Sequence, residues 1–301
     1  RKVSQKQKSF YQLVFNQTPF YPEGGGQVGD TGTIEANGQQ IAIFDTKKEN
    51  NLIIHLSTEL PTDCSATFTA NVNQEKRFAS AQNHSATHLL HHALRTVLGT
   101  HVEQKGSMVA PSNLRFDFSH FSKVTDEELA QIEALVCAAI QHNILLDERR
   151  NFPIDEAKKM GAMALFGEKY GDAVRVVKFG DSVELCGGTH VGSTGAIGLF
   201  KITSESAVAA GIRRIEAITG ATAEHYFRTK ASLLDEIALH LKNPKDLSKA
   251  VEDLIAKNNT LQKEIAIFQK EKAVLIKQEL KQKIVNIDGI NYLGEIVALD
   301  A

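Results

Sequence analysis

Two short patterns of histidine and cysteine stand about 100 residues apart in this 301-residue sequence. His84 and His88 lie in the segment HSATH, within a run that has helical hydrophobic spacing. Side chains four residues apart share one face of a helix, so both imidazoles can reach one ion. Cys186 and His190 have the same spacing in CGGTH, after a strand-like run, and the intervening glycines allow the backbone to bend. Three imidazoles and one thiolate form a ligand set suited to Zn²⁺.

Neither pattern is specific by itself. A histidine on a helix is more often a structural or surface residue than a ligand, and His91 and His92 follow directly. Zinc proteases with the H-E-x-x-H motif have a glutamate base where this sequence has Ser85, so no protease is indicated. The zinc prediction therefore depends on the two motifs meeting in the fold.

The segments that would position these residues change character along the chain. Residues 10–75 contain short runs with alternating or β-branched residues, separated by turn residues, which is typical of a small barrel or sandwich. The expected strands in this part are 10–15, 32–36, 41–45, 51–56 and 65–72.

The middle of the chain mixes helical and strand patterns. A helix is expected over 76–98 with a stop at Gly99, and a second one from Thr125 to about Asn143, where Glu128 completes a capping box. A hairpin is expected over 107–119. The other expected elements are a helix over 153–168 and strands at 173–179, 196–203 and 212–219. This pattern predicts an α+β arrangement in which helices lie against an antiparallel sheet.

The last third of the chain is predominantly helical. One helix is expected to end near Leu241, where Asn243-Pro244 breaks the pattern. From Leu247 apolar residues alternate at spacings of four and three, as in a coiled coil, and Asn258 falls at an a position that can fix register. The helix either packs back on its own neighbour or supports self-association. Residues 284–301 are strand-like and are expected to begin a further domain.

Composition limits the class of protein. At 42% hydrophobic and 23% charged residues the chain is globular, and a net charge of -2 excludes a uniformly basic nucleic-acid coat. No run is long enough to span a membrane and no secretory signal is visible, while three cysteines make no disulfide framework. We expect a reduced cytoplasmic protein with no membrane partner. The first residue is Arg1, which suggests a piece of a longer protein or a trimmed chain.

Five ordered motifs together resemble the editing domain of alanyl-tRNA synthetase. They are TPFYPEGGGQVGD, HSATHLLHHALRTVLGTHVEQKGSMV, RFDFSH, CGGTHVGSTGAIGLFKI and AGIRRIEAITG, within residues 10–225. The following helices resemble that enzyme's helical linker and the start of its C-terminal domain. Threonyl-tRNA synthetase shares the H-x-x-x-H and C-x-x-x-H core. The family's aminoacylation domain would lie upstream.

The resemblance implies roles for individual residues. It makes His84, His88, Cys186 and His190 the zinc ligands, and places Gln104 and Thr18 at the editing pocket. The remaining matches, to the glycine-rich motif and to a basic pair, are Gly24, Gly25, Gly26, Arg213 and Arg214. Lys105 lies within one of these motifs, and we expect it to contact tRNA together with the basic pair.

The resemblance also implies four parts. These are a β-barrel-like subdomain with the glycine motif (1–75), a zinc-containing editing core (76–225), a coiled-coil-like linker (226–283) and the start of a C-terminal domain (284–301). The implied reaction is hydrolysis of Ser-tRNA(Ala) and Gly-tRNA(Ala), because an alanine pocket rejects smaller or hydroxylated side chains by only about 10²-fold. With four protein ligands, zinc is expected mainly to organise the pocket. A free-standing trans-editing protein, a non-catalytic zinc-stabilised tRNA-binding module and a coiled-coil assembly element remain alternatives.

Overall fold

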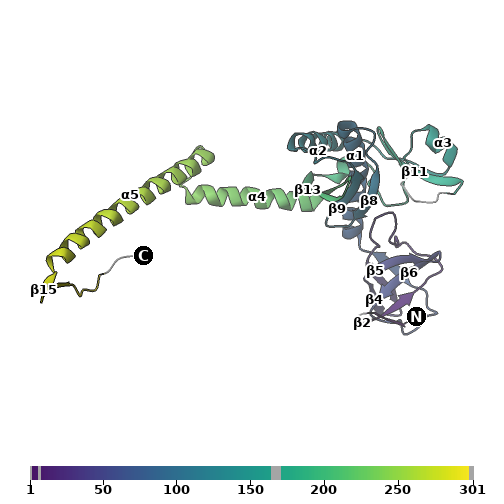
Figure 1. Ribbon diagram of the computed structural model, residues 1–301. Helices are drawn as coiled ribbons and strands as arrows, with labels where there is room; N and C mark the ends of the chain where they lie inside the picture. The colour runs from purple at the N-terminus through teal and green to yellow at the C-terminus, as the bar shows by residue number, and fades with distance from the viewer. Residues whose placement is uncertain (1, 6–7, 164–170, 298–301) are drawn as a thin grey trace. The chain divides into compact units, whose positions relative to one another are not determined.

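The computed structural model describes residues 2–5, 8–163 and 171–297. It divides into two compact units, Arg1–Arg228 and Thr229–Ala301. The first unit combines antiparallel sheets with helices, and the predicted α+β class is therefore confirmed (Figure 1). None of the described helices has both the length and the apolar character needed to cross a bilayer.

Two small antiparallel sheets form the N-terminal part of the first unit, with strand orders β1-β2-β6-β5 and β4-β3-β7. Their strands are β1 (Lys2–Gln5), β2 (Lys8–Leu13), β3 (Gly32–Ala36), β4 (Gln39–Ile43), β5 (Asp45–Glu49), β6 (Leu52–Ser57) and β7 (Thr69–Val72). The strand expected over 32–36 is confirmed to the residue. Strand β5 has the polar sequence DTKKE and was missed, because among its residues only Thr46 is fully buried. Closure into a barrel stays a prediction.

Helix α1 (Gln74–Leu98) is the central element of the first unit. It begins where the Asn73 side chain accepts the backbone N–H of Lys76 at 3.0 Å, and it ends at Gly99, whose positive φ of 112° favours glycine. Its middle portion is buried on almost every side, including polar residues that an ordinary amphipathic helix would expose. The predicted helix is thus confirmed, and its buried histidines point to a site inside the protein.

Helices α1 and α2 pack together beside a four-stranded sheet of order β13-β14-β9-β8 (Figure 1). The elements are β8 (Gln104–Val109), β9 (Leu114–Ser119), α2 (Asp126–Gln141), β13 (Phe200–Ala209) and β14 (Ile212–Thr219). The predicted capping box is confirmed: Thr125 Oγ1 accepts from Glu128 N, and Thr125 N donates to Glu128 Oε2. Phe116, Phe118 and Leu90 are among the fully buried residues of the core between these elements.

A three-stranded sheet of order β10-β11-β12 completes the first unit. Its region contains β10 (Asp147–Pro153), α3 (Ile154–Lys159), β11 (Ala173–Phe179), β12 (Ser182–Leu185) and the 3₁₀ helix η1 (Thr194–Ile197). Two predictions here were wrong. The helix expected over 153–168 ends at Lys159, followed by Gly161 at φ 80°, and Met163 pairs with β12; residues 164–170 lie outside the described residues. The strand expected from 196 starts only at Phe200, because η1 and Gly198 at φ 74° interrupt it.

The second unit contains the C-terminal part of α4 (Gly220–His240), α5 (Leu247–Gln282), β15 (Val285–Ile287) and β16 (Ile290–Tyr292). The predicted break at Asn243-Pro244 is confirmed, and Asp246 caps α5 by accepting the N–H of Lys249 at 2.9 Å. No residue of α5 is buried, and heptad positions such as Leu254 and Phe268 are exposed. A coiled coil is therefore not confirmed by this single chain and stays a prediction.

Candidate metal centre

The two histidine and cysteine motifs meet in the first unit. His84 and His88 project from α1, while Cys186 and His190 belong to the segment that follows β12. One possible ligand atom from each of the four residues lies within 4.8 Å of the others. Cys186 Sγ is 3.4 Å from His84 Nε2 and 3.3 Å from His190 Nε2. The four side chains could hold one metal ion.

The CGGTH segment is held in place by hydrogen bonds from a neighbouring side chain to its backbone carbonyls. Arg175 of β11 donates from Nη1 to the carbonyls of Cys186, at 2.9 Å, and Gly188, at 2.6 Å, while its Nε donates to Glu148 at 2.7 Å. A Cβ atom on residue 188 would overlap the ring of His84. Glycine at this position therefore lets the loop backbone lie directly against the first imidazole.

Burial keeps the three imidazoles uncharged. Desolvation, followed by the neighbouring His88, lowers the pKa of His84 to about 3. Desolvation is also the first cause that lowers the pKa of His88 and, to well below its usual value, that of His190. A neutral imidazole has a lone pair available for a metal ion, so the site presents ligands in the form that binds.

A buried carboxylate lies on the other side of His88. Glu184 Oε1 accepts a hydrogen bond from His91 Nδ1 at 2.8 Å, and its Oε2 is 3.5 Å from His88 Nε2. Burial raises the pKa of Glu184, but the attraction of His88 and the hydrogen bond from His91 outweigh it and lower the pKa overall. Among the described residues, the buried Nδ1 of His88 has no hydrogen-bond partner. The donor set thus includes an imidazole nitrogen whose bonding capacity is unused.

The glycine-rich segment reaches this centre through Gln27. Gly25 and Gly26 both have positive φ, and mutual backbone hydrogen bonds between Gly24 and Gln27 close the turn. Gly26 fits against β8, because a Cβ there would come within 2.8 Å of the carbonyl oxygen of Ser107. Beyond the turn, Gln27 Oε1 is 2.8 Å from His84 Nδ1. The backbone of the glycine-rich turn therefore lies directly against β8 of the same chain.

Known proteins match the regions that build this centre. Residues 174–216 match the family model described as "Threonyl and Alanyl tRNA synthetase second additional domain", and residues 1–76 match "tRNA synthetases class II (A)". An alanine–tRNA ligase of Christiangramia forsetii is 54% identical over 100% of this chain. The chain is related to alanyl-tRNA synthetases. Similar ligases of Cytophaga hutchinsonii, 55% identical over 97% of this chain, and Bacteroides thetaiotaomicron, 53% identical over 100%, show the same relationship.

The chain spans about a third of the length of these alanyl-tRNA synthetases. It covers 35% of the Christiangramia protein and 34% of each of the other two. The relationship covers the glycine-rich segment and both histidine and cysteine motifs, because all of them lie inside the aligned chain.

Gln104 and Lys105, matched above to the alanyl-tRNA synthetase editing motifs, lie at the start of β8. Gln104 is half-buried beside a β-bulge, with Phe118 of β9 as its partner in register. Lys105 is exposed, and its Nζ is 2.9 Å from Glu103 Oε2. The other end of β8 carries Val109, which pairs with Gln27. One strand thus connects Gln104 with the segment that contacts His84.

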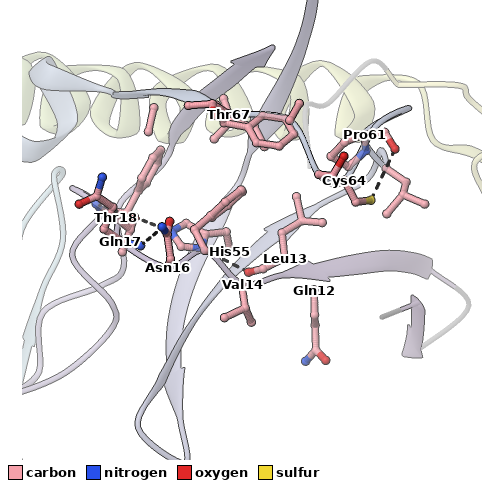
Figure 2. Close-up of a pocket in the computed structure, with 18 residues that line it drawn as sticks. Gln12, Leu13, Val14, Asn16, Gln17, Thr18, His55, Pro61, Cys64 and Thr67 are labelled. Carbon is pink, nitrogen blue, oxygen red and sulfur yellow. Dashed lines mark hydrogen bonds between the residues drawn. The ribbon is translucent and has the colours of Figure 1, made fainter. Parts of the chain in front are cut away.

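Thr18, the second residue matched to the alanyl-tRNA synthetase pocket, lines a different cavity. The cavity has a volume of about 560 Å³, and in it Thr18 Oγ1 is 2.7 Å from Nε2 of the buried His55. Figure 2 shows Thr18 and His55 side by side in its lining. The other ring nitrogen of His55 is 3.2 Å from the carbonyl oxygen of Leu13, and burial lowers the pKa of His55. The structure therefore groups Thr18 with His55, whereas it groups the four metal-site residues with Gln27.

Arg213 and Arg214, matched to the alanyl-tRNA synthetase basic pair, are both engaged in ion pairs. Arg213 forms two bonds to Glu205, at 2.5 and 2.6 Å, and Arg214 forms two bonds to Asp117, at 2.7 and 2.8 Å. Successive side chains of a strand point to opposite faces. The two guanidinium groups therefore do not form one basic patch.

Sequence reasoning missed three residues that support the centre: Gln27, Arg175 and Glu184. Gln27 stands directly after the three glycines, and this position next to a recognised motif was the available signal. Glu184 lies two residues before Cys186, in a short strand whose four residues are all buried. No local sequence pattern indicates that a charged residue such as Glu184 is buried in this strand. Only the contacts of the folded chain reveal these roles.

Proposed function

We propose that this chain carries out hydrolytic editing: it removes serine or glycine from mischarged tRNA(Ala). The observation that carries the proposal is the convergence of His84, His88, Cys186 and His190. Two of these residues lie inside the region matched to the domain named for both threonyl and alanyl tRNA synthetases. Relatives named alanine–tRNA ligase, similar along the whole chain, support the choice of tRNA.

We propose Zn²⁺ as the resident metal. A thiolate and three neutral imidazoles suit zinc, whereas Mg²⁺ and Ca²⁺ prefer oxygen ligands. The buried Nδ1 of His88, which has no partner among the described residues, fits a site built for a further bond. Four protein ligands are typical of a closed, structural site. When bound, zinc would hold α1 and the CGGTH segment together and shape the pocket that receives the terminal adenosine.

The hydrolysis needs a positioned water and little further activation. Water attacks the ester carbonyl carbon, and the bond from that carbon to the ribose oxygen breaks. The ribose oxygen takes up a proton, so the products are the free amino acid and tRNA with a free terminal hydroxyl. We assign Gln104 to accept a hydrogen bond from the attacking water, and backbone N–H groups to stabilise the developing oxyanion. The position of Gln104 on β8, the strand that pairs with Gln27, supports this role.

Selectivity must spare the correct alanyl ester. A pocket that hydrogen-bonds the serine hydroxyl does so, because alanine would leave the buried polar partner unsatisfied. We assign this contact to Gln104 and Thr18. The hydroxyl of Thr18 is already oriented by His55 and by the N–H of Phe20, which donates to it at 3.1 Å, so it is held in a fixed position.

Contact with tRNA is proposed to be local. Arg213, Arg214 and Lys105 would bind phosphates, with Gly24–Gly26 shaping the approach. Arg214 uses Nε and Nη2 for Asp117, which leaves its Nη1 edge to face a phosphate. Each contact of this kind releases counterions, so binding should weaken steeply with salt.

The four-part division at 75, 225 and 283 is also proposed, together with self-association through α5. Exposed apolar side chains recur along α5 at spacings of three and four, including Leu254, Leu261 and Phe268. Such a stripe is the pattern that two-stranded coiled coils bury.

The direct test is deacylation of seryl-, glycyl- and alanyl-tRNA(Ala) by this chain, with zinc quantified in the same sample. We expect rapid loss of the serine and glycine esters and a stable alanine ester, with one zinc per chain. Tight tRNA binding without deacylation, in a zinc-bearing sample, would instead establish a non-catalytic tRNA-binding module. The same esters presented to variant Gln104→Ala report whether the amide acts in the reaction.

A further inference from the structure

Gln27 is completely buried between two segments that are far apart in sequence. On one side lies α1 with His84, and on the other lies the CGGTH segment with Thr189. The contact between Gln27 and Thr189 spans 162 residues of chain. A buried amide that touches both ligand-bearing segments has a role beyond closing a glycine-rich turn.

The contact with His84 determines where its proton lies. A carboxamide oxygen can only accept hydrogen bonds, and Gln27 Oε1 is 2.8 Å from His84 Nδ1. A neutral imidazole carries one N–H, so that proton must be on Nδ1. The lone pair is then on Nε2, the nitrogen that is 3.4 Å from Cys186 Sγ. Gln27 thus leaves the correct nitrogen of His84 free to bind a metal.

The contacts with Thr189 fix the second pair of ligands. Gln27 Oε1 accepts the backbone N–H of Thr189 at 2.9 Å, and Gln27 Nε2 donates to Thr189 Oγ1 at the same distance. Thr189 stands directly before His190 and three residues after Cys186. One amide therefore fixes α1 and the CGGTH segment in position relative to each other.

The backbone of Gln27 is itself rigidly held. Its N–H donates to the carbonyl of Gly24 at 3.0 Å, and the neighbouring Val28 N–H donates to the carbonyl of Val109 at 3.0 Å. In return, Val109 N–H donates to the carbonyl of Gly26 at 2.7 Å. The glycine-rich turn is therefore fixed to β8 on both sides of Gln27, so its amide is oriented before any ion binds.

We infer that Gln27 is a positioning residue of the metal centre, which selects the Nδ1–H tautomer of His84 and aligns Thr189 and its two flanking ligands. The inference rests on the metal centre of the proposed function. It gives the glycine-rich motif a role in metal binding. The glycines allow the turn, and the turn places the side-chain amide of Gln27 beside His84. A purely space-filling role for Gln27 would need neither its oxygen nor its nitrogen.

The test compares Gln27→Met, which keeps the volume but removes both polar atoms, with Gln27→Glu, which keeps an acceptor for His84 and Thr189. The matched control is Gln40→Met at an exposed glutamine of β4. Zinc affinity is measured by competition with a chromophoric chelator, and the site is examined by the visible absorption of bound Co²⁺. We expect Gln27→Met to weaken zinc binding by about 10–100-fold and to alter the Co²⁺ spectrum, as loss of a partner behind a ligand does. Gln27→Glu should restore most of the affinity.

A second measurement needs no variant that could misfold. In the metal-free wild-type chain, two-bond ¹H–¹⁵N NMR correlations report the tautomer of His84, which we expect to be Nδ1–H. Finding the proton on Nε2 overturns the inference. Unchanged zinc affinity and an unchanged Co²⁺ spectrum in Gln27→Met, beside a wild type that binds zinc, also overturn it and leave the proposed function intact. A wild type that binds neither ion removes the metal centre itself, and this inference with it.

Discussion

The imidazole of His84 occupies the space in which a side chain on residue 188 would begin. A Cβ atom built on Gly188 overlaps Cε1 and Nδ1 of that ring and lies 3.0 Å from Oε1 of Gln27. The backbone of the CGGTH segment and the imidazole of His84 are therefore in direct contact. Any residue larger than glycine must displace either the ring or the loop.

The variant Gly188→Ala should therefore lose metal affinity. We expect a loss at least as large as removal of a partner behind a ligand causes, about 10–100-fold. Gly187→Ala is the matched control, since a Cβ on Gly187 meets nothing within 4 Å. The measurement is zinc competition with a chromophoric chelator. Equal affinities for the two variants would show that the loop yields easily, contrary to this account.

Bound zinc should stabilise the first unit. A ligand that binds only the folded state at 100 times its Kd adds about 2.7 kcal/mol to the free energy of unfolding. Urea denaturation with zinc and with a chelator measures this difference. We expect Cys186→Ser to lose most of the zinc-dependent stabilisation, while Cys64→Ser, at an exposed cysteine outside the cluster, keeps it. Zinc-dependent stabilisation that survives in Cys186→Ser would place the ion elsewhere.

The metal-free chain should lose stability as the pH falls below about 6.5. The folded-state pKa of His84 is lowered to about 3, and those of His88 and His190 are lowered too. Because the unfolded state takes up protons near pH 6.5 while the folded state does not, the stability is complete above that pH. Below it, each such histidine reduces the free energy of unfolding by up to about 1.4 kcal/mol per pH unit.

Urea denaturation in a chelator, repeated from pH 7.5 to 4.5, measures this slope. His84→Gln should make the dependence shallower, whereas His142→Gln, at an exposed position, should leave it unchanged. An identical slope in all three proteins would mean that other groups control the acid sensitivity.

Arg214 should contribute to tRNA binding through charge. If its Nη1 edge meets one phosphate, Arg214→Gln reduces the slope of log K against log salt by about 1. Fluorescence anisotropy with labelled tRNA over a salt series measures this slope. Because Arg214 also holds Asp117, Asp117→Asn serves as the comparison that disturbs the ion pair but keeps the cation. A slope unchanged in Arg214→Gln would make this arginine purely structural.

Self-association through α5 should depend on its apolar stripe. Replacing Leu261 with Asp places a charge in the proposed seam and should lower the mass measured by light scattering to that of one chain. Lys263→Asp also introduces an aspartate on α5, but at the f position of the heptad, which points away from the seam, and should not change the mass. A wild type that is already monomeric at high concentration would show that α5 has no partner of this kind.

Sequence reasoning succeeded where the determining interactions are local. The spacing of His84 and His88 on a helix, and the capping box of Thr125 with Glu128, depend on residues only three or four apart. The strand limits failed near residue 196 because a 3₁₀ turn, which has only a weak sequence signature, precedes Phe200. Strand β5, with the polar sequence DTKKE, was missed for a similar reason: its pairing with β6 is decided by the rest of the fold.

The site could be predicted only in part, for the same physical reason. The four residues of the cluster were recognisable because each pair has a short, fixed spacing. The bond between Gln27 and Thr189 joins residues 162 positions apart, and no local pattern encodes it. The resemblance placed Thr18 and Gln104 at one pocket, whereas the structure puts Thr18 beside His55 and leaves the shared pocket as a proposal.

The bond between Gln27 and His84 also limits how this protein can be dissected. The class II (A) match ends at residue 76, which would be a natural place to cut the gene. A chain beginning there would keep all four residues of the cluster and yet lose the Gln27 amide, which we propose orients His84. The parts of the chain before and after residue 76 are thus not interchangeable modules: the second part, moved to a new host, would need an acceptor there equivalent to the amide oxygen of Gln27.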